Sequence, residues 1–338
     1  MTICTLYDLR QDEDAKRYIT RRCLEAMSSQ ERALLDLYNK HASIIDTLES
    51  LAERGDITLL IQLPEGDFAG YALLTEHKNT WTGAAEGFIY ALDVKQQLLY
   101  TPLVQEFLEA IRQWGIGRGY PLLRVVVPEG RIFQPLIAYL QSLGWVTSCL
   151  VPYKILSSSL EPTDMELILH HDDEIHIRMA SEKDYPFVFQ LLAEATWSGL
   201  SPFEKSLLDC ETLVKNICQD FEPMLNEGTA WSLVAETVRE GLCAHATVLQ
   251  GTHNLLDIPE AELVDTFVLP TYGGRRLGSK LTAHVLAKCL NQGIHLVCGS
   301  LVAESTSEES VQRVRLNLEQ MGWWMSSRIM YWDIVSSK

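Results

Sequence analysis

The stretch with the clearest chemical potential is a glycine- and arginine-rich turn that reads Val268-Leu-Pro-Thr-Tyr-Gly-Gly-Arg-Arg-Leu-Gly-Ser-Lys-Leu281. A β-type run, Glu262 to Val268, precedes this turn, and a helical apolar pattern that ends at Leu290 follows it. Backbone N–H groups point outward where a strand and a small-residue turn lead into a helix, and the helix dipole favours anions. The spacing therefore predicts a place that holds a pyrophosphate group.

The elements that must position this turn follow from hydrophobic periodicity. In the first half we expect helices over 12–27 and 28–54, a strand pair over 58–63 and 69–75, and a strand over 87–94. A helix over 103–114 follows Pro102, since proline suits the first helical turn. A strand over 122–127, a helix over 134–143 and a closing hairpin-like pair that includes 151–156 complete this half.

The second half repeats this order. We expect a strand over 175–179, a helix over 184–195 capped by Ser181, strands over 231–236, 242–249 and 262–268, a helix over 279–290, a strand over 294–298, a helix over 308–321 and a last strand over 327–334. Leu143-Gly-Trp matches Met321-Gly-Trp, and Asp93-Val matches Phe267-Val, both at an offset of about 175 residues. The chain therefore reads as a tandem duplication with domains at 1–157 and 175–338, joined by a linker at 158–174.

Composition and charge limit the classes of function. The chain has 338 residues, of which 47% are hydrophobic, so it buries a large core. Its net charge is −17, whereas nucleic-acid binders carry a basic stripe. We therefore expect no nucleic-acid partner and a monomer or homodimer, with a surface compatible with a cationic small substrate.

Cysteine usage and hydropathy point to a cellular compartment. No cysteines form a C-x-x-C pair, and most have apolar neighbours, which is typical of buried free thiols in a reducing cytosol. No apolar run reaches the roughly 20 residues that span a bilayer, and the N-terminus lacks the pattern of a secretion signal. The sequence predicts a cytoplasmic protein with no membrane partner. The eight cysteines are Cys4, Cys23, Cys149, Cys210, Cys218, Cys243, Cys289 and Cys298.

The expected linker contains four residues of metal-ligating type, His170, His171, Asp172 and Asp173. They are adjacent in sequence rather than brought together from separate elements, so we predict no metal site there.

The strand–turn–helix with a later helix, Gly-aromatic pair and strand resembles the GNAT superfamily of acyl-CoA-dependent N-acyltransferases. The resemblance is clear in the second half and weak in the first. It implies an α/β (α+β) fold of two tandem GNAT-like domains, each a mixed, mostly antiparallel sheet flanked by helices, with a degenerate N-terminal copy. It also implies acetyl-CoA as co-substrate, no metal, and acetyl transfer to a primary amine of a small molecule, such as an antibiotic or an amino metabolite.

In that family the turn reads Arg/Gln-x-x-Gly-x-Gly/Ala, and its amides hold the pyrophosphate of coenzyme A. The first key position falls on Gly273 and the second on Arg276, which both depart from the pattern, whereas Gly278 retains it. Arg276 either points away or pairs with a phosphate. The alternative is a glycine-rich connection without a ligand. The residues implied in acyl-CoA binding are Phe267, Val268, Leu269, Gly273, Gly274, Arg275, Arg276, Leu277, Gly278 and Ser279.

The first-half counterpart of the turn, 94–102, contains no glycine, so side chains are expected to crowd a phosphate there. The family's tyrosine acid, four residues before the Gly-aromatic pair, is replaced by Leu318 and in the first half by Leu140, with Tyr139 one residue away. The resemblance thus implies that the standard leaving-group acid is missing from both copies.

Two residues are candidates for the proton transfer that amine acylation requires. Asp265 is the better base, with Glu262 as a weaker one, and a carboxylate that fixes a neighbouring loop is the alternative. His245, in an otherwise apolar strand, is a candidate relay or a satisfied core histidine.

Trp197, Phe203 and Trp231 are candidates for an acceptor pocket or for ordinary aromatic packing. The altered turn and the missing tyrosine also leave open a catalytically silent acyl-CoA-binding or partner-binding protein. Use of a longer acyl donor, or decarboxylation of a malonyl donor, is a third reading.

Overall fold

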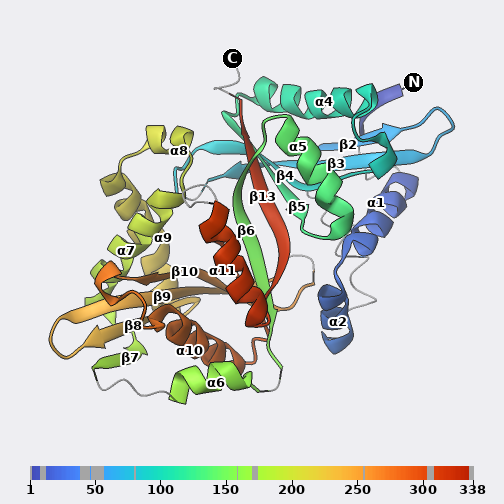
Figure 1. Cartoon of the computed structure of the whole chain (residues 1–338). Coiled ribbons are helices and arrows are strands. Elements are labelled where there is room, and N and C mark those ends of the chain that lie inside the picture. Colours follow the sequence, from blue (N-terminus) through green and yellow to red (C-terminus); the bar gives the residue numbers. More distant parts are fainter. Residues whose placement is uncertain are drawn as a thin grey trace. The chain divides into compact units, whose positions relative to one another are not determined.

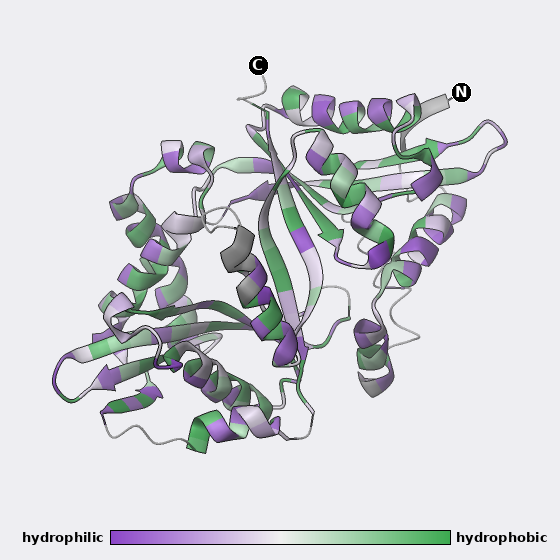
Figure 2. Cartoon of the chain, in the orientation of Figure 1, coloured by the Kyte–Doolittle hydropathy of each residue, from purple (hydrophilic) through white to green (hydrophobic). Residues whose placement is uncertain are grey.

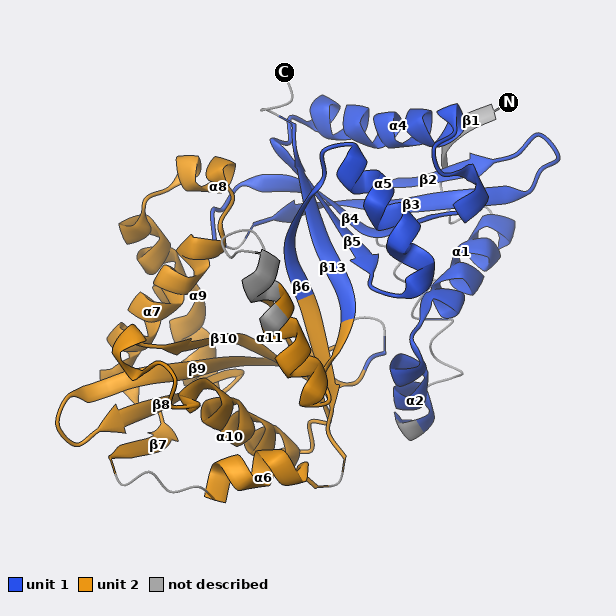
Figure 3. Cartoon of the chain, in the orientation of Figure 1, with its two compact units in different colours: residues 1–150, 254–257, 326–338 blue, residues 151–253, 258–325 orange. Residues whose placement is uncertain are grey.

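The computed structural model describes residues 2–7, 13–38, 46, 57–79, 81–157, 159–169, 174–253, 256–302 and 308–334. The chain divides into two compact units (Figure 3). Unit 1 comprises residues 1–150, 254–257 and 326–338, and unit 2 comprises residues 151–253 and 258–325. Each unit is a mixed sheet with helices on both faces, as expected.

Unit 1 builds its sheet in the order β1-β2-β3-β4-β5-β13, antiparallel except where β4 and β5 run parallel (Figure 1). Helix α4 packs on one face and α1 on the other, because alternate residues of β2 and β3 point to opposite sides. Its elements are β1 (Thr2–Tyr7), α1 (Glu13–Ala26), α2 (Ser29–Tyr38), β2 (Ile57–Gln62), β3 (Phe68–Lys78), β4 (Ala85–Val94), α4 (Pro102–Arg118), β5 (Leu122–Pro128), α5 (Gln134–Ser142), residues 146–150 of β6 (Val146–Ile155) and most of β13 (Trp324–Asp333).

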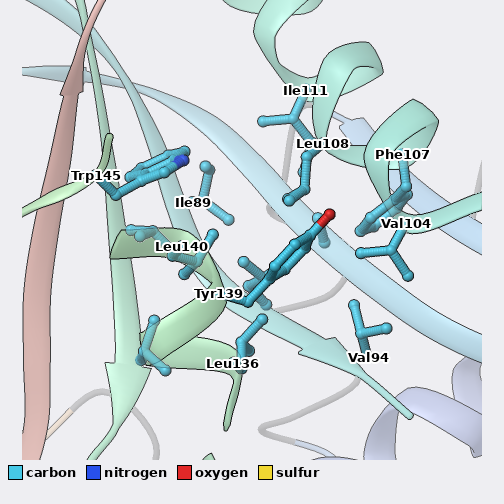
Figure 4. Close-up of a cluster of buried hydrophobic side chains, with 14 of the residues drawn as sticks. Ile89, Val94, Val104, Phe107, Leu108, Ile111, Leu136, Tyr139, Leu140 and Trp145 are labelled. Carbon is cyan, nitrogen blue, oxygen red and sulfur yellow. The ribbon is translucent and has the colours of Figure 1, made fainter. Parts of the chain in front are cut away.

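Helix α4 shows how the sequence pattern becomes packing. It starts at Pro102 as predicted, and it ends at Gly119, whose left-handed backbone (φ 75°) suits glycine. Hydrophilic and hydrophobic residues alternate along its coil (Figure 2). Its buried residues Val104, Phe107, Leu108 and Ile111 recur at helical spacing and enter the main core of unit 1 together with α5 (Figure 4).

Unit 2 builds its sheet in the order β6-β11-β10-β9-β8-β7, in which β10 and β11 are parallel. Helix α10 packs on one face, and α7 and α9 cover the other (Figure 1). The predicted cap at Ser181 is confirmed as a capping box with Asp184. The elements are α6 (Pro162–Leu169), β7 (Ile175–Met179), α7 (Tyr185–Gly199), α8 (Pro202–Leu207), α9 (Cys210–Glu227), β8 (Ala230–Thr237), β9 (Gly241–Thr252), β10 (Pro259–Val268), α10 (Leu277–Asn291), β11 (Leu296–Gly299), β12 (Leu301–Val302) and α11 (Glu308–Gln320).

The predicted duplication reappears in the sheet register. Gly87 of β4 pairs with Leu123 of β5 as Ala261 of β10 pairs with Val297 of β11. One extra residue bulges out of the pairing with the preceding strand in each unit, Tyr90 in β4 and Val264 in β10. The separation along the chain is the same for all these pairs of corresponding residues.

The boundaries of the two units differ from the expected domain boundaries at residues 157 and 175. The last strand, β13, pairs with β5 in unit 1, where Tyr331 lies opposite Arg124. The expected hairpin near 151–156 is instead the single strand β6, whose second half pairs with β11 in unit 2, with Ile155 opposite Leu296. The last strand of the second repeat therefore belongs mostly to unit 1, and the second half of the last strand of the first repeat belongs to unit 2.

The expected linker contains the helix α6, which is packed rather than free. Lys154 Nζ donates to Asp164 Oδ2 at 2.8 Å and to the carbonyl oxygen of Met321 at 2.7 Å, and both charged side chains are buried. The candidate metal residues 170–173 lie outside the described residues, and the described part of the chain contains no cluster that could hold a metal ion. Among the described helices, none is long and apolar enough to cross a membrane. None of the described cysteines forms a disulfide with another; these are the cysteines at 23, 149, 210, 218, 243, 289 and 298.

Candidate functional site

The predicted phosphate turn forms a defined backbone shape at the end of β10. A single 3₁₀ turn, Pro270–Tyr272, precedes Gly274, whose φ is 81°. Arg276 then adopts φ 55° and ψ 22° immediately before α10. This is the left-handed region, which costs a residue with a side chain roughly 1–2 kcal/mol relative to glycine. Position 276 thus adopts a conformation that favours glycine, although its residue is arginine.

The first turn of α10 presents unpaired donors. The first backbone hydrogen bond of the helix runs from Lys280 N–H to the Arg276 carbonyl at 3.0 Å. The N–H groups of Leu277, Gly278 and Ser279 therefore lack intrahelical partners, and no side chain caps the helix at Arg276. Such a helix start is a site for an anion.

Basic side chains surround this helix start in a strongly acidic chain. Residues 273–276 are exposed, and Lys280 follows in the first turn of α10. The Arg275 guanidinium lies over the ring of Tyr272, 5.6 Å from its centroid, and 3.3 Å from Glu174. Arg276 makes no ion pair among the described residues, so its charge is available to a bound anion.

Within the part of the chain that the structure describes, the strand before the turn has a partly unpaired edge. β10 pairs with β9 from residue 259 to 268, but with β11 only from 260 to 263. A Cβ atom added at Gly278 would lie 3.8 Å from the methyl groups of Thr266 and Val268, so the helix start lies beside the strand end. The free edge at Phe267, Val268 and Leu269 and the donors of α10 together suit an extended ligand that ends in a phosphate.

The two predicted catalytic residues meet on the sheet face opposite α10. His245 Nε2 lies 3.3 Å from Asp265 Oδ2. His245 Nδ1 lies 3.1 Å from Thr247 Oγ1, which is 2.8 Å from Ser232 Oγ. The histidine side chain is fully buried, whereas the Asp265 side chain is 17% exposed. The bulge at Val264 stands directly before Asp265 and sets the direction of its side chain.

Unpaired polar atoms mark the same face. Among the described residues, Asp265 Oδ2, His245 Nε2 and Glu260 Oε1 are buried and make no well-formed hydrogen bond. Buried polar atoms are nearly always paired, so such atoms indicate where a water or a polar ligand group binds.

Sequence reasoning missed Glu260, which shares this face with Glu262 and Asp265 through the register with β9. Burial raises the pKa of Glu260 despite hydrogen bonds from Cys298 and Tyr153. Surrounding protein also raises the pKa of Glu262, although part of its side chain reaches solvent. The two-residue spacing of Glu260 and Glu262 is a strand signal that marks a shared face.

An aromatic group lies beside these carboxylates. The rings of Tyr153 and Trp324 stack with centroids 5.7 Å apart, and His253 meets Tyr153 edge-on at 5.8 Å. Burial lowers the pKa of His253 to about 4, so this imidazole is neutral near pH 7. Tyr153 and Trp324 lie far apart in the chain, and no sequence pattern links them.

One of the three predicted acceptor residues does not lie on the face of Asp265. Trp231 is 5% exposed and belongs to the core on the α10 face, where Lys288 Nζ lies 5.0 Å from its ring centroid. Trp231 therefore faces away from Asp265. Trp197 lies in the last turn of α7 and Phe203 in α8, and both are half-buried.

Unit 1 keeps part of the backbone shape of the turn but fills the corresponding places with side chains. Tyr100, which matches Gly274, is left-handed with φ 68°, and Pro102 removes an N–H from the first turn of α4. Tyr71 stands where unit 2 has His245. Arg22 donates hydrogen bonds to both carboxylate oxygens of Asp93, from Nε at 2.6 Å and from Nη2 at 3.1 Å. These features support the prediction that the N-terminal copy is degenerate.

The positions of the family's tyrosine acid are apolar in both units. Leu318 packs against the core of unit 2, and Leu140 is buried in the core of unit 1. Tyr139 is buried too, among residues of α4 and α5 (Figure 4).

No protein-family model and no curated protein match the sequence. Among solved structures, a GCN5-related N-acetyltransferase from Sphaerobacter thermophilus aligns with a TM-score of 0.52 and 16% identity over 86% of this chain and 85% of that chain. A tandem GNAT protein from the clavulanic acid biosynthesis pathway aligns with a TM-score of 0.47 and 14% identity over 82% of both chains. A functionally unknown conserved protein from Staphylococcus epidermidis aligns with a TM-score of 0.49 and 14% identity over 79% of this chain and 92% of that one.

Proposed function

The chain has the GNAT fold in two tandem units, and we propose that unit 2 is an acyl-CoA-dependent N-acetyltransferase that acts on a primary amine of a small molecule. The observation that carries the proposal is the start of α10, where unpaired N–H groups and basic side chains lie beside the open edge of β10. This arrangement suits a long ligand with a phosphate group at one end, and acyl-CoA is such a ligand. The free cysteines agree with a reducing compartment, and we propose a cytoplasmic location.

In this proposal the donor runs from the turn toward the polar face. The pyrophosphate binds the amides of Leu277, Gly278 and Ser279, with Arg275 and Arg276 supplying positive charge. The glycines at 273 and 274 leave room for the phosphates. The pantetheine arm follows the free edge at Phe267, Val268 and Leu269, which brings the thioester toward Asp265.

The chemistry then needs one proton acceptor. The uncharged amine nitrogen attacks the thioester carbonyl carbon, and the tetrahedral intermediate collapses by breaking the C–S bond. Asp265 accepts the proton of the attacking nitrogen, directly or through a water, and His245 behind it holds the carboxylate in place. The sulfur leaves as a thiolate and takes a proton from solvent, since a thiol has a pKa of only about 8.5. This route uses no tyrosine at position 318.

The acceptor is proposed to be a cation in solution. Glu260, Glu262 and Asp265 place three carboxyl groups on one face of β10, and the chain carries a net charge of −17. Such a field concentrates ammonium groups near the site. Glu260, whose pKa is raised by burial, is a further candidate proton acceptor on this face.

Two measurements test the proposal. Isothermal titration with acetyl-CoA should show binding, and thiol release with a panel of small amines should show turnover that depends on the amine. Absence of acetyl-CoA binding would overturn the donor site. Tight binding without turnover on any amine would instead favour a catalytically silent acyl-CoA-binding protein. The motivating observation is that the tyrosine position is occupied by Leu318, which packs against the core of unit 2.

A further inference from the structure

Unit 1 contains a groove that the proposed acetyl transfer does not use. Its volume is about 560 Å³, within the range of small-molecule sites. Its walls come from α4 (Leu108, Arg112), from the segment after α5 (Leu143, Trp145) and from Trp332 of β13. We propose that this groove binds a small organic cation that carries a flat aromatic group.

The floor and one wall of the groove are apolar. Leu108 and Trp145 are buried and belong to the main core of unit 1 (Figure 4). The rings of Trp145 and Trp332 lie 5.9 Å apart between centroids and are tilted by 32°. The two indoles thus pack against each other, and together with Leu143 they give the groove an apolar surface on which a flat ring can pack.

The position of the Arg112 side chain shows that the Trp332 side of the groove accepts a cation. Its guanidinium carbon lies 5.0 Å from the Trp332 ring centroid, and its Nη1 lies 3.3 Å from both carboxylate oxygens of Glu109. The negative charge of Glu109 is thereby balanced. Arg112 Nε is buried without a hydrogen-bond partner among the described residues.

Glu106 leaves the groove with an unbalanced negative charge. It lines the groove from the exposed face of α4, and it makes no hydrogen bond or ion pair within the part of the chain that the structure describes. An aromatic ring that packs on this apolar surface, with an ammonium group at Glu106, satisfies both features. A neutral or anionic ligand of the same shape leaves Glu106 unpaired.

The probe for the test is dansylcadaverine, a naphthalene with a primary ammonium group, and the control ligand is uncharged dansylamide. Fluorescence titration of the full chain should show saturable binding of dansylcadaverine and binding of dansylamide that is about tenfold weaker, since a charged hydrogen bond is lost. Equal affinity for both ligands would overturn the proposal.

Variants locate the probe. Glu106→Gln should weaken dansylcadaverine binding about tenfold, and Leu143→Arg at the exposed rim should weaken it further by repulsion and bulk. Glu211→Gln removes the same charge from an exposed position in α9 and should leave the affinity unchanged. Loss of binding in Asp265→Asn, with none in Glu106→Gln, would place the probe in unit 2 and overturn the proposal.

Discussion

His245 Nε2 lies 3.3 Å from Asp265 Oδ2, with the histidine fully buried and the carboxylate side chain partly open to solvent. The other imidazole nitrogen lies against Thr247, so the ring is held from both sides. Two residues that lie far apart in the sequence are therefore neighbours in the structure. The carboxylate of Asp265 faces the proposed substrate, and His245 supports it from the buried side.

Asp265→Asn should lower kcat at least about 100-fold, since general base catalysis contributes that much or more. The amide keeps the size of the carboxylate but cannot take the proton. The affinity for acetyl-CoA, measured by isothermal titration, should change little. A variant that turns over at the parent rate would make Asp265 a structural residue and would leave Glu260 as the candidate base.

Gly278→Glu should abolish detectable acetyl-CoA binding. The new side chain starts 3.8 Å from Thr266 and Val268 and brings a negative charge to the unpaired amides of α10. Gly251→Glu is the matched control, because Gly251 is exposed in β9 and a Cβ there has open space. If Gly278→Glu retained the parent affinity, the donor site would lie elsewhere.

Met330→Asp should destabilise unit 1 and not unit 2. The reason is that Met330 lies in β13, the last strand of the second repeat, which packs in the core of unit 1. Met330 is fully buried, so a charge there costs at least about 3 kcal/mol. Hydrogen exchange should accelerate in α4 and remain slow in α10. Met179→Asp, at an exposed position in β7, serves as the control. Faster exchange confined to unit 2 would contradict the assignment of β13.

Asp184→Asn should destabilise the protein more at neutral pH than in acid. Hydrogen bonds from Arg178 hold the pKa of Asp184 well below its ordinary value. Because the folded-state pKa is lowered, the stabilisation is complete above the unfolded-state pKa of about 3.9. It is lost as the pH falls through the folded-state value.

The measurement compares the urea midpoints of parent and Asp184→Asn at pH 7 and pH 3. The difference should be clear at pH 7 and smaller at pH 3. Glu182→Gln, in the same turn but with no such ion pair, should differ little from the parent at both pH values. A pH-independent difference would show that the capping geometry, and not the charge, stabilises this turn.

Local patterns in the sequence predicted most elements and the position of the turn. The apolar spacing in α4, the Ser181 cap and the glycines at 273, 274 and 278 each act within a few residues, so their consequences are readable without the fold. The Arg276 backbone was not readable, because a left-handed arginine follows from the geometry of the whole turn rather than from arginine itself.

The sequence by itself determined the repeat, the order of helices and strands, and the chemistry available at the start of α10. Only the tertiary structure decided which strand pairs with the last strand of each repeat. The unpaired backbone groups at the edge of a sheet can bond to any suitable strand, so the sequence does not specify the partner. The tertiary structure also decided that Asp265 shares a face with Glu262 and His245. The two acidic residues are three positions apart, so a regular strand would place them on opposite faces, and the extra residue Val264 reverses that order.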